Sequence, residues 1–346
     1  MNPTMTETPS ELSTAELASQ VAAFRDCFSR LNREVQKAIV GHDELISDAL
    51  VAMFSQGHVL MEGVPGLGKT FLVKVLSQVL GLSFGRVQCT PDLMPADVLG
   101  THIVGEDETG RRAFRFEKGP VFNNLLLVDE INRATPKTQA ALLEVMQEHA
   151  VTAGGEHMPV PEPFFVLATQ NPLEMEGTYP LPEAQLDRFF FKLHVPFPKV
   201  DELAEISRRT THFEQPQLEV ALGGDEFVQY QRLLSHVPVA DPLTRYAASL
   251  VLATHPDQDV ADERVKRYVS YGASPRGMQA LIRGARAYCL IEGRTAVAVE
   301  DIRRVAKPVL RHRVILNFEG EAEQVDVDEL IEGVLNNVAT PAQGAA

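Results

Sequence analysis

Residues 58–80 contain glycines, a lysine and a threonine whose spacing suits the binding of phosphate. Gly63, Gly68, Lys69 and Thr70 fit the pattern G-x-x-x-x-G-K-[ST]. Glycine lets the backbone bend so that successive N–H groups point at phosphate oxygens, and the N-terminus of a following helix adds partial positive charge. In such a loop the lysine reaches the β- and γ-phosphates and the hydroxyl binds Mg²⁺, so we assign these roles to Lys69 and Thr70.

The residues on either side of this loop supply the context that the motif requires. The apolar run Val59–Met61 precedes it and predicts a strand. A chance glycine-rich turn is the alternative, but such a turn needs neither a strand before it nor a helix after it. The helix is predicted by apolar residues at Phe71, Leu72, Val75, Leu76, Val79 and Leu80. The predicted nucleotide contacts are Gly63, Val64, Pro65, Gly66, Leu67, Gly68, Lys69, Thr70 and Phe71.

Two adjacent carboxylates, Asp129 and Glu130, end the apolar segment NLLLVDEI at residues 124–131. A run of apolar residues without alternation predicts a strand that is buried on both faces of a parallel sheet. In phosphate-loop ATPases an acid at the end of the strand beside the loop holds Mg²⁺. We therefore expect Asp129 to act at the metal together with Thr70, and Glu130 to polarise the attacking water as a general base. The alternative is a pair of solvated acids at a strand end.

Three further polar residues are candidates on weaker grounds. Asn171 follows a predicted strand in ATQNP, where a side chain can reach a nucleotide crevice, although Asn-Pro is also a routine turn. Arg188, in QLDRFFF, is either an ion-pair partner of Asp187 or a charge directed at the γ-phosphate of another subunit. Arg276, in GASPRG, starts a helix, where an arginine gains nothing from the helix dipole, so a phosphate contact explains it better.

Strands and helices alternate through the first part of the chain. The strands after the loop are predicted in LSFGRVQCT, NLLLVDEI, PFFVLATQNP and FFFKLHVPF. This alternation predicts an α/β fold with a parallel sheet and helices on both of its faces. Two glycine-punctuated segments, at about 100–120 and 150–161, have the pattern of hairpins. From Val200 onward the pattern is helical, so we predict an all-helical second domain whose border lies near Pro196–Val200.

The length and composition bound the class of protein. With 346 residues the chain is long enough for two domains. The net charge of −15, from 32 Lys and Arg against 47 Asp and Glu, weakens any case for tight nucleic-acid binding. Cys27, Cys89 and Cys289 lack metal-site spacing and predict a reducing compartment. No apolar run approaches the ~18 residues of a membrane span and no signal-peptide pattern is present, so we predict a cytoplasmic protein.

Several segments together resemble the MoxR family of AAA+ ATPases. They are, in order, GVPGLGKT, FEKGPVFNNLLLVDEINRATPKTQAALLEVMQE, ATQNP, EGTYPLPEAQLDRF and YGASPRG. The resemblance extends from about residue 30 to residue 320. It implies five parallel strands in the order 5-1-4-3-2, a helical lid and a ring, usually hexameric, that binds nucleotide between subunits.

The same resemblance gives roles to the weaker candidates. Asn171 resembles sensor 1, Arg188 the arginine finger and Arg276 sensor 2, and Val40 and Gly41 match the segment near the adenine. Residues about 100–120 resemble the helix-2 insert and about 150–161 the hairpin before sensor 1, both on the pore side. The predicted domains are a disordered tail over 1–15, a nucleotide-binding domain over 16–198, a helical lid over 199–335 and a flexible tail over 336–346.

The resemblance also implies a function. Family members are similar to chaperones that remodel or activate partners, including by metal insertion, often with a von Willebrand factor A protein encoded nearby. We therefore expect ATP and Mg²⁺ as cofactors and a protein as the substrate. The alternatives are a scaffold that binds ATP to assemble with little turnover, and a ring motor on nucleic acid. Intact Glu130 and Arg188 disfavour the scaffold, and the acidic balance disfavours the motor.

Overall fold

A five-stranded parallel sheet lies at the centre of the computed structural model, which describes residues 13–106, 112–153, 155–172, 177–211 and 216–341. Its strands, from edge to edge, are β2 (Phe84–Gln88), β5 (Leu125–Asp129), β8 (Phe165–Gln170), β1 (Val59–Glu62) and β9 (Phe191–His194). Numbered by their order along the chain, these strands stand as 5-1-4-3-2 when read from β9. The predicted α/β class and strand order are therefore confirmed.

Helices cover both faces of the sheet because its central strands are apolar on both sides. Leu125 and Leu127 of β5 belong to one apolar cluster, whereas the alternate residues Leu126 and Val128 belong to a second cluster on the opposite face. The first face packs against α1 (Thr14–Ala38), α2 (Asp43–Phe54) and α3 (Lys69–Val79). The second face packs against α4 (Pro95–Leu99) and α5 (Pro136–Glu148), and the short helices η1 (Ile131–Arg133) and α6 (Glu183–Leu186) lie in the connections.

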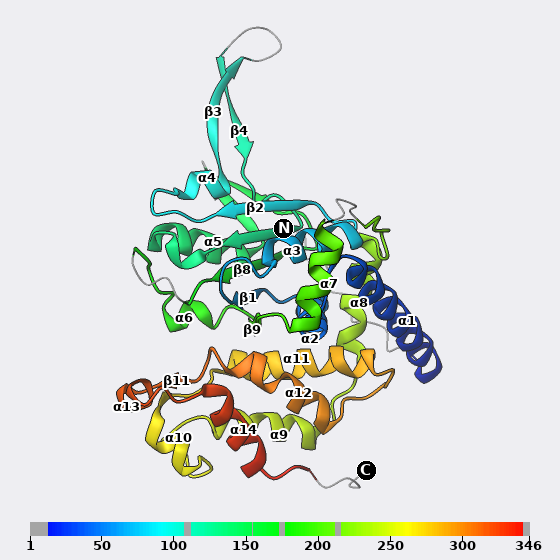
Figure 1. The fold of residues 1–346 in the computed structure, drawn as a ribbon, viewed down its shortest axis with the longest axis vertical. Coiled ribbons are helices and arrows are strands. Elements are labelled where there is room, and N and C mark those ends of the chain that lie inside the picture. The colour runs from blue at the N-terminus through cyan, green and yellow to red at the C-terminus, as the bar shows by residue number, and fades with distance from the viewer. Residues whose placement is uncertain (1–12, 107–111, 154, 173–176, 212–215, 342–346) are drawn as a thin grey trace, which may run out of the picture.

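Two antiparallel hairpins interrupt this core. Strands β3 (Gly100–Glu106) and β4 (Arg112–Lys118) form the longer one, which projects away from the sheet in Figure 1. Strands β6 (Ala150–Ala153) and β7 (Glu156–Pro159) form the shorter one, directly after α5. Both lie in the segments that the sequence predicts as hairpins. Residues 107–111 and 154, which these predictions include, are outside the described part of the chain.

The C-terminal part is mainly helical, as predicted. Its helices are α9 (Asp241–Leu252), α10 (Glu263–Tyr268), α11 (Pro275–Ile291), α12 (Val299–Leu310), α13 (Phe318–Ala322) and α14 (Val327–Asn337). It also contains one antiparallel pair, β10 (Val269–Tyr271) with β11 (Ile315–Leu316), which the prediction of an all-helical domain does not include. Strands of two or three residues are too short to give a recognisable alternation in the sequence.

The helices just beyond the predicted domain border lie against the first domain. They are α7 (Val200–Thr211) and α8 (Gly224–His236), drawn beside α1 and α3 in Figure 1. The ring of Phe227 in α8 stacks on Phe54 of α2 with centroids 4.4 Å apart, and the Gln231 amide donates to the Met53 carbonyl. The border near residues 196–200 stays a prediction, as do the terminal tails. Helix α1 starts at Thr14, and residues 1–12 and 342–346 lie outside the described part.

The parallel sheet fixes which segments meet at each of its edges. Strands β1, β5 and β8 end at Glu62, Asp129 and Gln170, so the segments that follow them share the carboxyl edge. At the amino edge, the Phe190 N–H donates to the His58 carbonyl at 2.8 Å, which joins the start of β9 to the start of β1. Within the part of the chain that is described, no helix has both the length and the apolar character needed to cross a membrane.

Candidate active site

The loop between β1 and α3 leaves open space above its glycines. Gly66 and Gly68 have φ angles of +85° and +77°, a left-handed conformation that favours glycine. Apart from the residues adjacent in the chain, no atom of the described residues lies within 4 Å of the place where a Cβ would stand on either glycine. The helix begins at Lys69, so its unpaired N–H groups face this space. Such a concave backbone at a helix N-terminus fits a phosphate group.

Lys69 lies below this space, with 9% of its surface exposed. Its Nζ donates to the Gly63 carbonyl at 2.5 Å and approaches the Val64 carbonyl at 3.4 Å. Burial lowers the pKa of Lys69 from its ordinary value, and the nearby carboxylates of Asp129 and Glu130 oppose that shift. The lysine is thus held within its own loop by backbone oxygens, for which phosphate oxygens can substitute.

Thr70 and Asp129 meet beside the loop. The Thr70 Oγ1 lies 3.4 Å from Asp129 Oδ2, which also accepts from the Arg86 guanidinium at 2.9 Å, and Asp129 Oδ1 accepts from the Thr169 hydroxyl at 2.7 Å. A hydroxyl and a carboxylate are hard oxygen donors of the kind that Mg²⁺ takes, together with waters and substrate phosphates. Among the described residues, no group of three or more His, Cys, Asp or Glu could hold a metal by itself. The donor set therefore fits Mg²⁺ that arrives with a nucleotide.

Glu130 is fixed through both its backbone and its side chain. Its φ angle of 57° is left-handed, which is uncommon for a residue with a Cβ and persists only where the surroundings hold it. The Glu130 N–H donates to the Thr169 hydroxyl at 2.8 Å. Its Oε2 accepts from Gln88 at 3.0 Å and from Arg133 at 3.2 Å. The carboxylate is therefore placed at the carboxyl edge, next to Asp129.

Asn171 lies at the same edge. It follows β8 directly, and only 5% of its surface is exposed. Because β8 lies between β5 and β1 in the sheet, this residue stands between the strand that carries the acids and the strand that leads into the loop. The position agrees with a polar side chain at a nucleotide crevice.

A cavity of about 260 Å³ continues from the loop. Most of its lining is apolar and comes from the end of α1, the loop and the segment after β9. Val40 lines it, and neighbouring Gly41, with a φ of +69°, packs against Glu202 so closely that a Cβ would lie 2.6 Å from that carboxylate. Leu67, Phe71 and Phe197 also line it, together with residues of α7. An apolar cavity that opens onto a phosphate-binding loop suits a purine ring.

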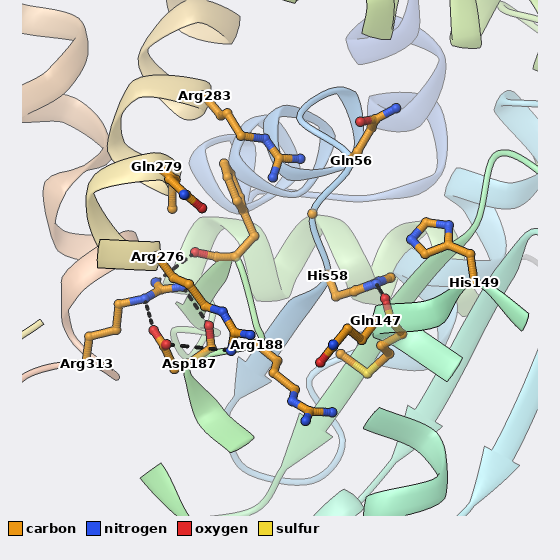
Figure 2. Close-up of a pocket in the computed structure, with 14 residues that line it drawn as sticks. Gln56, His58, Gln147, His149, Asp187, Arg188, Arg276, Gln279, Arg283 and Arg313 are labelled. Carbon is orange, nitrogen blue, oxygen red and sulfur yellow. Dashed lines mark hydrogen bonds and ion pairs between the residues drawn. The ribbon is translucent and has the colours of Figure 1, made fainter. Parts of the chain in front are cut away.

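The two remaining candidates, Arg188 and Arg276, lie elsewhere. Both line a second cavity, of about 210 Å³, whose wall includes Gln56, Gly57 and His58 at the start of β1 (Figure 2). This is the amino edge of the sheet, whereas the phosphate-binding loop follows the end of β1. A four-residue strand spans about 13 Å, so the length of β1 separates these arginines from the loop of their own chain.

The partners of Asp187 argue against one of the two interpretations of Arg188, the ion pair with Asp187. Arg188 donates to the Leu143 carbonyl at 2.9 Å, while Asp187 pairs with Arg313 at 2.8 Å. The carboxylate next to Arg188 in sequence is therefore engaged by a different arginine. This leaves the guanidinium of Arg188 on the wall of the cavity.

Sequence reasoning does not identify four residues that hold the candidate side chains in place. They are Arg86, Gln88 and Thr169 at the carboxyl edge and Arg313 at the second cavity. Arg86 and Gln88 alternate along β2, and Gln88 lies opposite Asp129 in the register of the two strands, so alternation in LSFGRVQCT was a usable signal. Thr169 and Arg313 carry no such signal, because their partners are set only by the tertiary fold.

Comparison with known proteins gives matches in both parts of the chain. The model described as the ATPase family associated with various cellular activities (AAA) matches residues 58–191. The AAA lid domain model matches residues 261–334. The first interval contains the loop, both acids and Arg188, and the second contains Arg276 and Arg313.

Several relatives match over nearly the whole chain. Chaperone MoxR1 of Mycobacterium tuberculosis is 43% identical over 328 residues, which cover 95% of this chain and 86% of the relative. Protein MoxR of Methylorubrum extorquens is 34% identical over 337 residues, which cover 92% of this chain and 96% of the relative. A crystal structure from Cytophaga hutchinsonii matches with a TM-score of 0.88 at 39% identity, over 94% of this chain and 98% of that one.

Thr169 gives a test of the site that does not remove any of its charged groups. Thr169→Val keeps the volume of the side chain but removes the donor to Asp129 and the acceptor of the Glu130 N–H. We expect the free energy of unfolding in urea to fall by about 1–3 kcal/mol, the cost of unpaired buried polar groups. Phosphate release from ATP should fall by at least about tenfold, because 1.4 kcal/mol of lost transition-state stabilisation has that effect.

Thr169→Ser is the matched control, since serine keeps the hydroxyl and loses only a methyl group. It should retain most of the activity. Equal activity of the valine and serine variants would mean that the hydroxyl does not position the two acids.

Proposed function

The chain belongs to the MoxR family of AAA+ ATPases, and we propose that it hydrolyses ATP in order to remodel, mature or activate a partner protein. The observation that carries this proposal is the meeting of Thr70, Asp129 and Glu130 beside an open phosphate-binding loop. A scaffold that only binds ATP needs the loop. It does not need a second carboxylate, held by two side-chain donors, at the position of a general base.

In the proposed reaction each side chain of the carboxyl edge has one task. Lys69 exchanges its loop carbonyls for phosphate oxygens, and Thr70 and Asp129 hold Mg²⁺, which neutralises charge on the phosphates when it is bound. Glu130 accepts the proton of the attacking water, and Asn171 orients that water. The apolar cavity beside Val40 and Gly41 takes the adenine ring.

We also propose that the site is completed by a second copy of the chain. Arg188 and Arg276 stand at the amino edge of the sheet, too far along β1 to reach the loop of their own subunit. In a ring, usually hexameric in this family, the amino edge of one subunit meets the nucleotide of the next. Arg188 then acts as the arginine finger and Arg276 as sensor 2 on the neighbour's γ-phosphate, where their charge stabilises the transition state.

The proposed partner is a protein with a von Willebrand factor A domain, and the proposed compartment is the cytoplasm. Family resemblance motivates the partner, and metal insertion into an enzyme is one outcome of such a pairing. The three cysteines support the compartment, since Cys27, Cys89 and Cys289 are all buried free thiols.

Binding and hydrolysis should separate in two variants. Lys69→Ala removes the lysine from the phosphate-binding loop and should lose ATP binding, measured with a fluorescent ATP analogue. Glu130→Gln keeps the loop and the shape of the side chain, so it should bind ATP normally and release phosphate far more slowly. Hydrolysis by Glu130→Gln at the wild-type rate would show that Glu130 is not the general base.

The partner can be sought with the same two variants. Glu130→Gln in the presence of ATP should hold the nucleotide-bound state and enrich a protein with a von Willebrand factor A domain from a cell extract, identified by mass spectrometry. Lys69→Ala is the matched control and should enrich it less, because it does not reach that state. Recovery of nucleic acid alone, with ATPase stimulated by DNA, would favour a nucleic-acid motor instead.

The shared site predicts that two inactive variants complement each other. Lys69→Ala still offers Arg188, whereas Arg188→Ala still binds ATP. When they are mixed and co-assemble, some interfaces pair an intact loop with an intact finger, so ATPase activity should reappear and rise with protein concentration. Arginine fingers contribute on the order of 10³ to 10⁵ in rate, so the recovery should be readily measurable. A mixture that co-assembles and stays inactive would mean that Arg188 acts within its own chain or not at all.

A further inference from the structure

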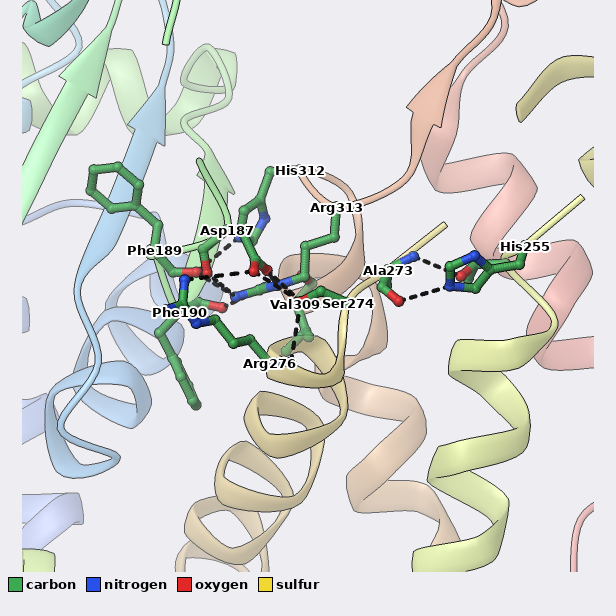
Figure 3. Close-up of polar contacts among 11 residues, drawn as sticks. Asp187, Phe189, Phe190, His255, Ala273, Ser274, Arg276, Val309, His312 and Arg313 are labelled. Atoms are coloured by element: carbon green, nitrogen blue, oxygen red, sulfur yellow. Dashed lines mark hydrogen bonds and ion pairs between the residues drawn. The ribbon is translucent and has the colours of Figure 1, made fainter. Parts of the chain in front are cut away.

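Asp187 joins three segments that are far apart in sequence (Figure 3). Its carboxylate accepts from the Ser274 hydroxyl at 2.9 and 2.8 Å, and from Arg313 Nε at 2.8 Å. The Arg276 guanidinium lies 3.9 Å away. Asp187 itself directly precedes Arg188. One carboxylate thus contacts both the start of α11 and the segment after α12, and it does so beside the proposed arginine finger.

Arg313 uses all five of its N–H donors. Besides the Asp187 carboxylate, it donates to the backbone carbonyls of Asp187, Phe189 and Phe190, at 3.2, 2.6 and 3.2 Å, and to that of Val309. Its side chain is 3% exposed. Burial lowers its pKa, and the Asp187 carboxylate opposes that shift. Three of the four carbonyls belong to residues 187–190. Arg313 is therefore hydrogen-bonded to the backbone on both sides of Arg188.

A glycine next to Arg313 leaves room for its side chain. Gly277 lies in the first turn of α11, and a Cβ there would stand 3.1 Å from the Arg313 Cδ. The neighbouring His312 ring contacts the Phe189 carbonyl with Nε2 at 2.9 Å, and the Arg311 guanidinium donates to the Lys192 carbonyl at 3.1 Å. Three consecutive residues of the lid therefore bind the backbone before β9 and at its start.

Three of the four arginines that line this cavity differ in how many of their N–H donors the protein already uses. Arg276 is 52% exposed, and Arg188 donates to one carbonyl, so both have N–H groups left for a ligand. Arg313 has none left. A phosphate that enters the cavity can meet the first two, while the third has its whole donor set committed to the protein.

We propose that Asp187 and Arg313 are positioning residues, which hold Arg188 and Arg276 at one fixed spacing so that both reach the same phosphate of a nucleotide bound by a neighbouring subunit. This inference rests on the shared site proposed above. Arg188 belongs to the first domain and Arg276 to the lid, and the Asp187 carboxylate joins their two segments through the Ser274 hydroxyl. The buried Arg313 guanidinium holds that carboxylate and the backbone on either side of Arg188. Lid and finger therefore move as one unit.

The test is to measure which inactive variants restore ATPase activity when each is mixed with Asp187→Asn. Its own loop is intact, so ATP affinity should be unchanged while kcat falls by about 10²-fold, the cost of misplacing a catalytic group by about 1 Å. Mixed with Lys69→Ala, which offers an intact finger, it should regain activity. Mixed with Arg188→Ala it should stay inactive, because neither chain then offers a correctly placed finger.

Two further variants make the result decisive. Arg313→Lys keeps the buried charge but offers three donors in place of five, and it should show the same direction of complementation; it also replaces Asp187→Asn if that variant does not fold. Asp241→Asn removes the carboxylate of an exposed pair with Arg245, in which the side chains are 73% and 80% exposed, and should behave as wild type in every mixture.

The outcomes separate this inference from the proposal on which it rests. If Lys69→Ala and Arg188→Ala fail to complement each other, the shared site is wrong and the positioning role falls with it. If they complement while Asp187→Asn rescues Arg188→Ala, or fails to be rescued by Lys69→Ala despite verified co-assembly, then only the positioning role is wrong. Wild-type kcat in both Asp187→Asn and Arg313→Lys would overturn it as well.

Discussion

The common direction of the strands in a parallel sheet is the constraint on which this site depends. The segments after β1, β5 and β8 must meet at one edge, which brings the phosphate-binding loop, the two acids and Asn171 together. The same constraint sends the residues before β1 and β9 to the opposite edge, where Arg188 lies. A chain with its two acids at one edge and Arg188 and Arg276 at the other needs a second copy if all four are to act on one nucleotide.

Burial on both faces makes the carboxyl edge rigid. The residues Leu125–Val128 are fully enclosed between two apolar clusters, so the strand that ends in Asp129 has little freedom to move. The left-handed backbone of Glu130 then turns the chain sharply, and Thr169 from the neighbouring strand holds both acids through one hydroxyl. Such a site holds the two carboxylates in fixed positions before any ligand arrives, and preorganisation of this kind is what catalysis requires.

Local patterns were sufficient to predict the elements that are long and regular. The phosphate-binding loop, the helix α3 after it and the buried strand β5 follow from spacing and periodicity alone, and the order of the strands followed from resemblance to a family. The Asp187–Arg313 pair could not be predicted in either way, because its members are 126 residues apart and an arginine in RHRV has no signal that distinguishes it from a surface charge. The role of Thr169 could not be predicted for the same reason. Threonine is common in strands, and the sequence does not show which polar groups lie beside it.

The cavity at the amino edge is lined by an excess of positive charge, whereas the whole chain is negatively charged. The protein carries a net charge of −15, yet four arginines and one aspartate line this cavity, namely Arg188, Arg276, Arg283, Arg313 and Asp187. Charges separated by more than about 10 Å in water are largely screened at ordinary ionic strength, so the net charge of the chain acts weakly here and the arginines decide what the cavity attracts. An extended polyanion would also contact other parts of a chain whose net charge is negative, whereas a single phosphate group would contact the cavity alone. The distribution of charge therefore favours a compact anion over a strand of nucleic acid at this cavity.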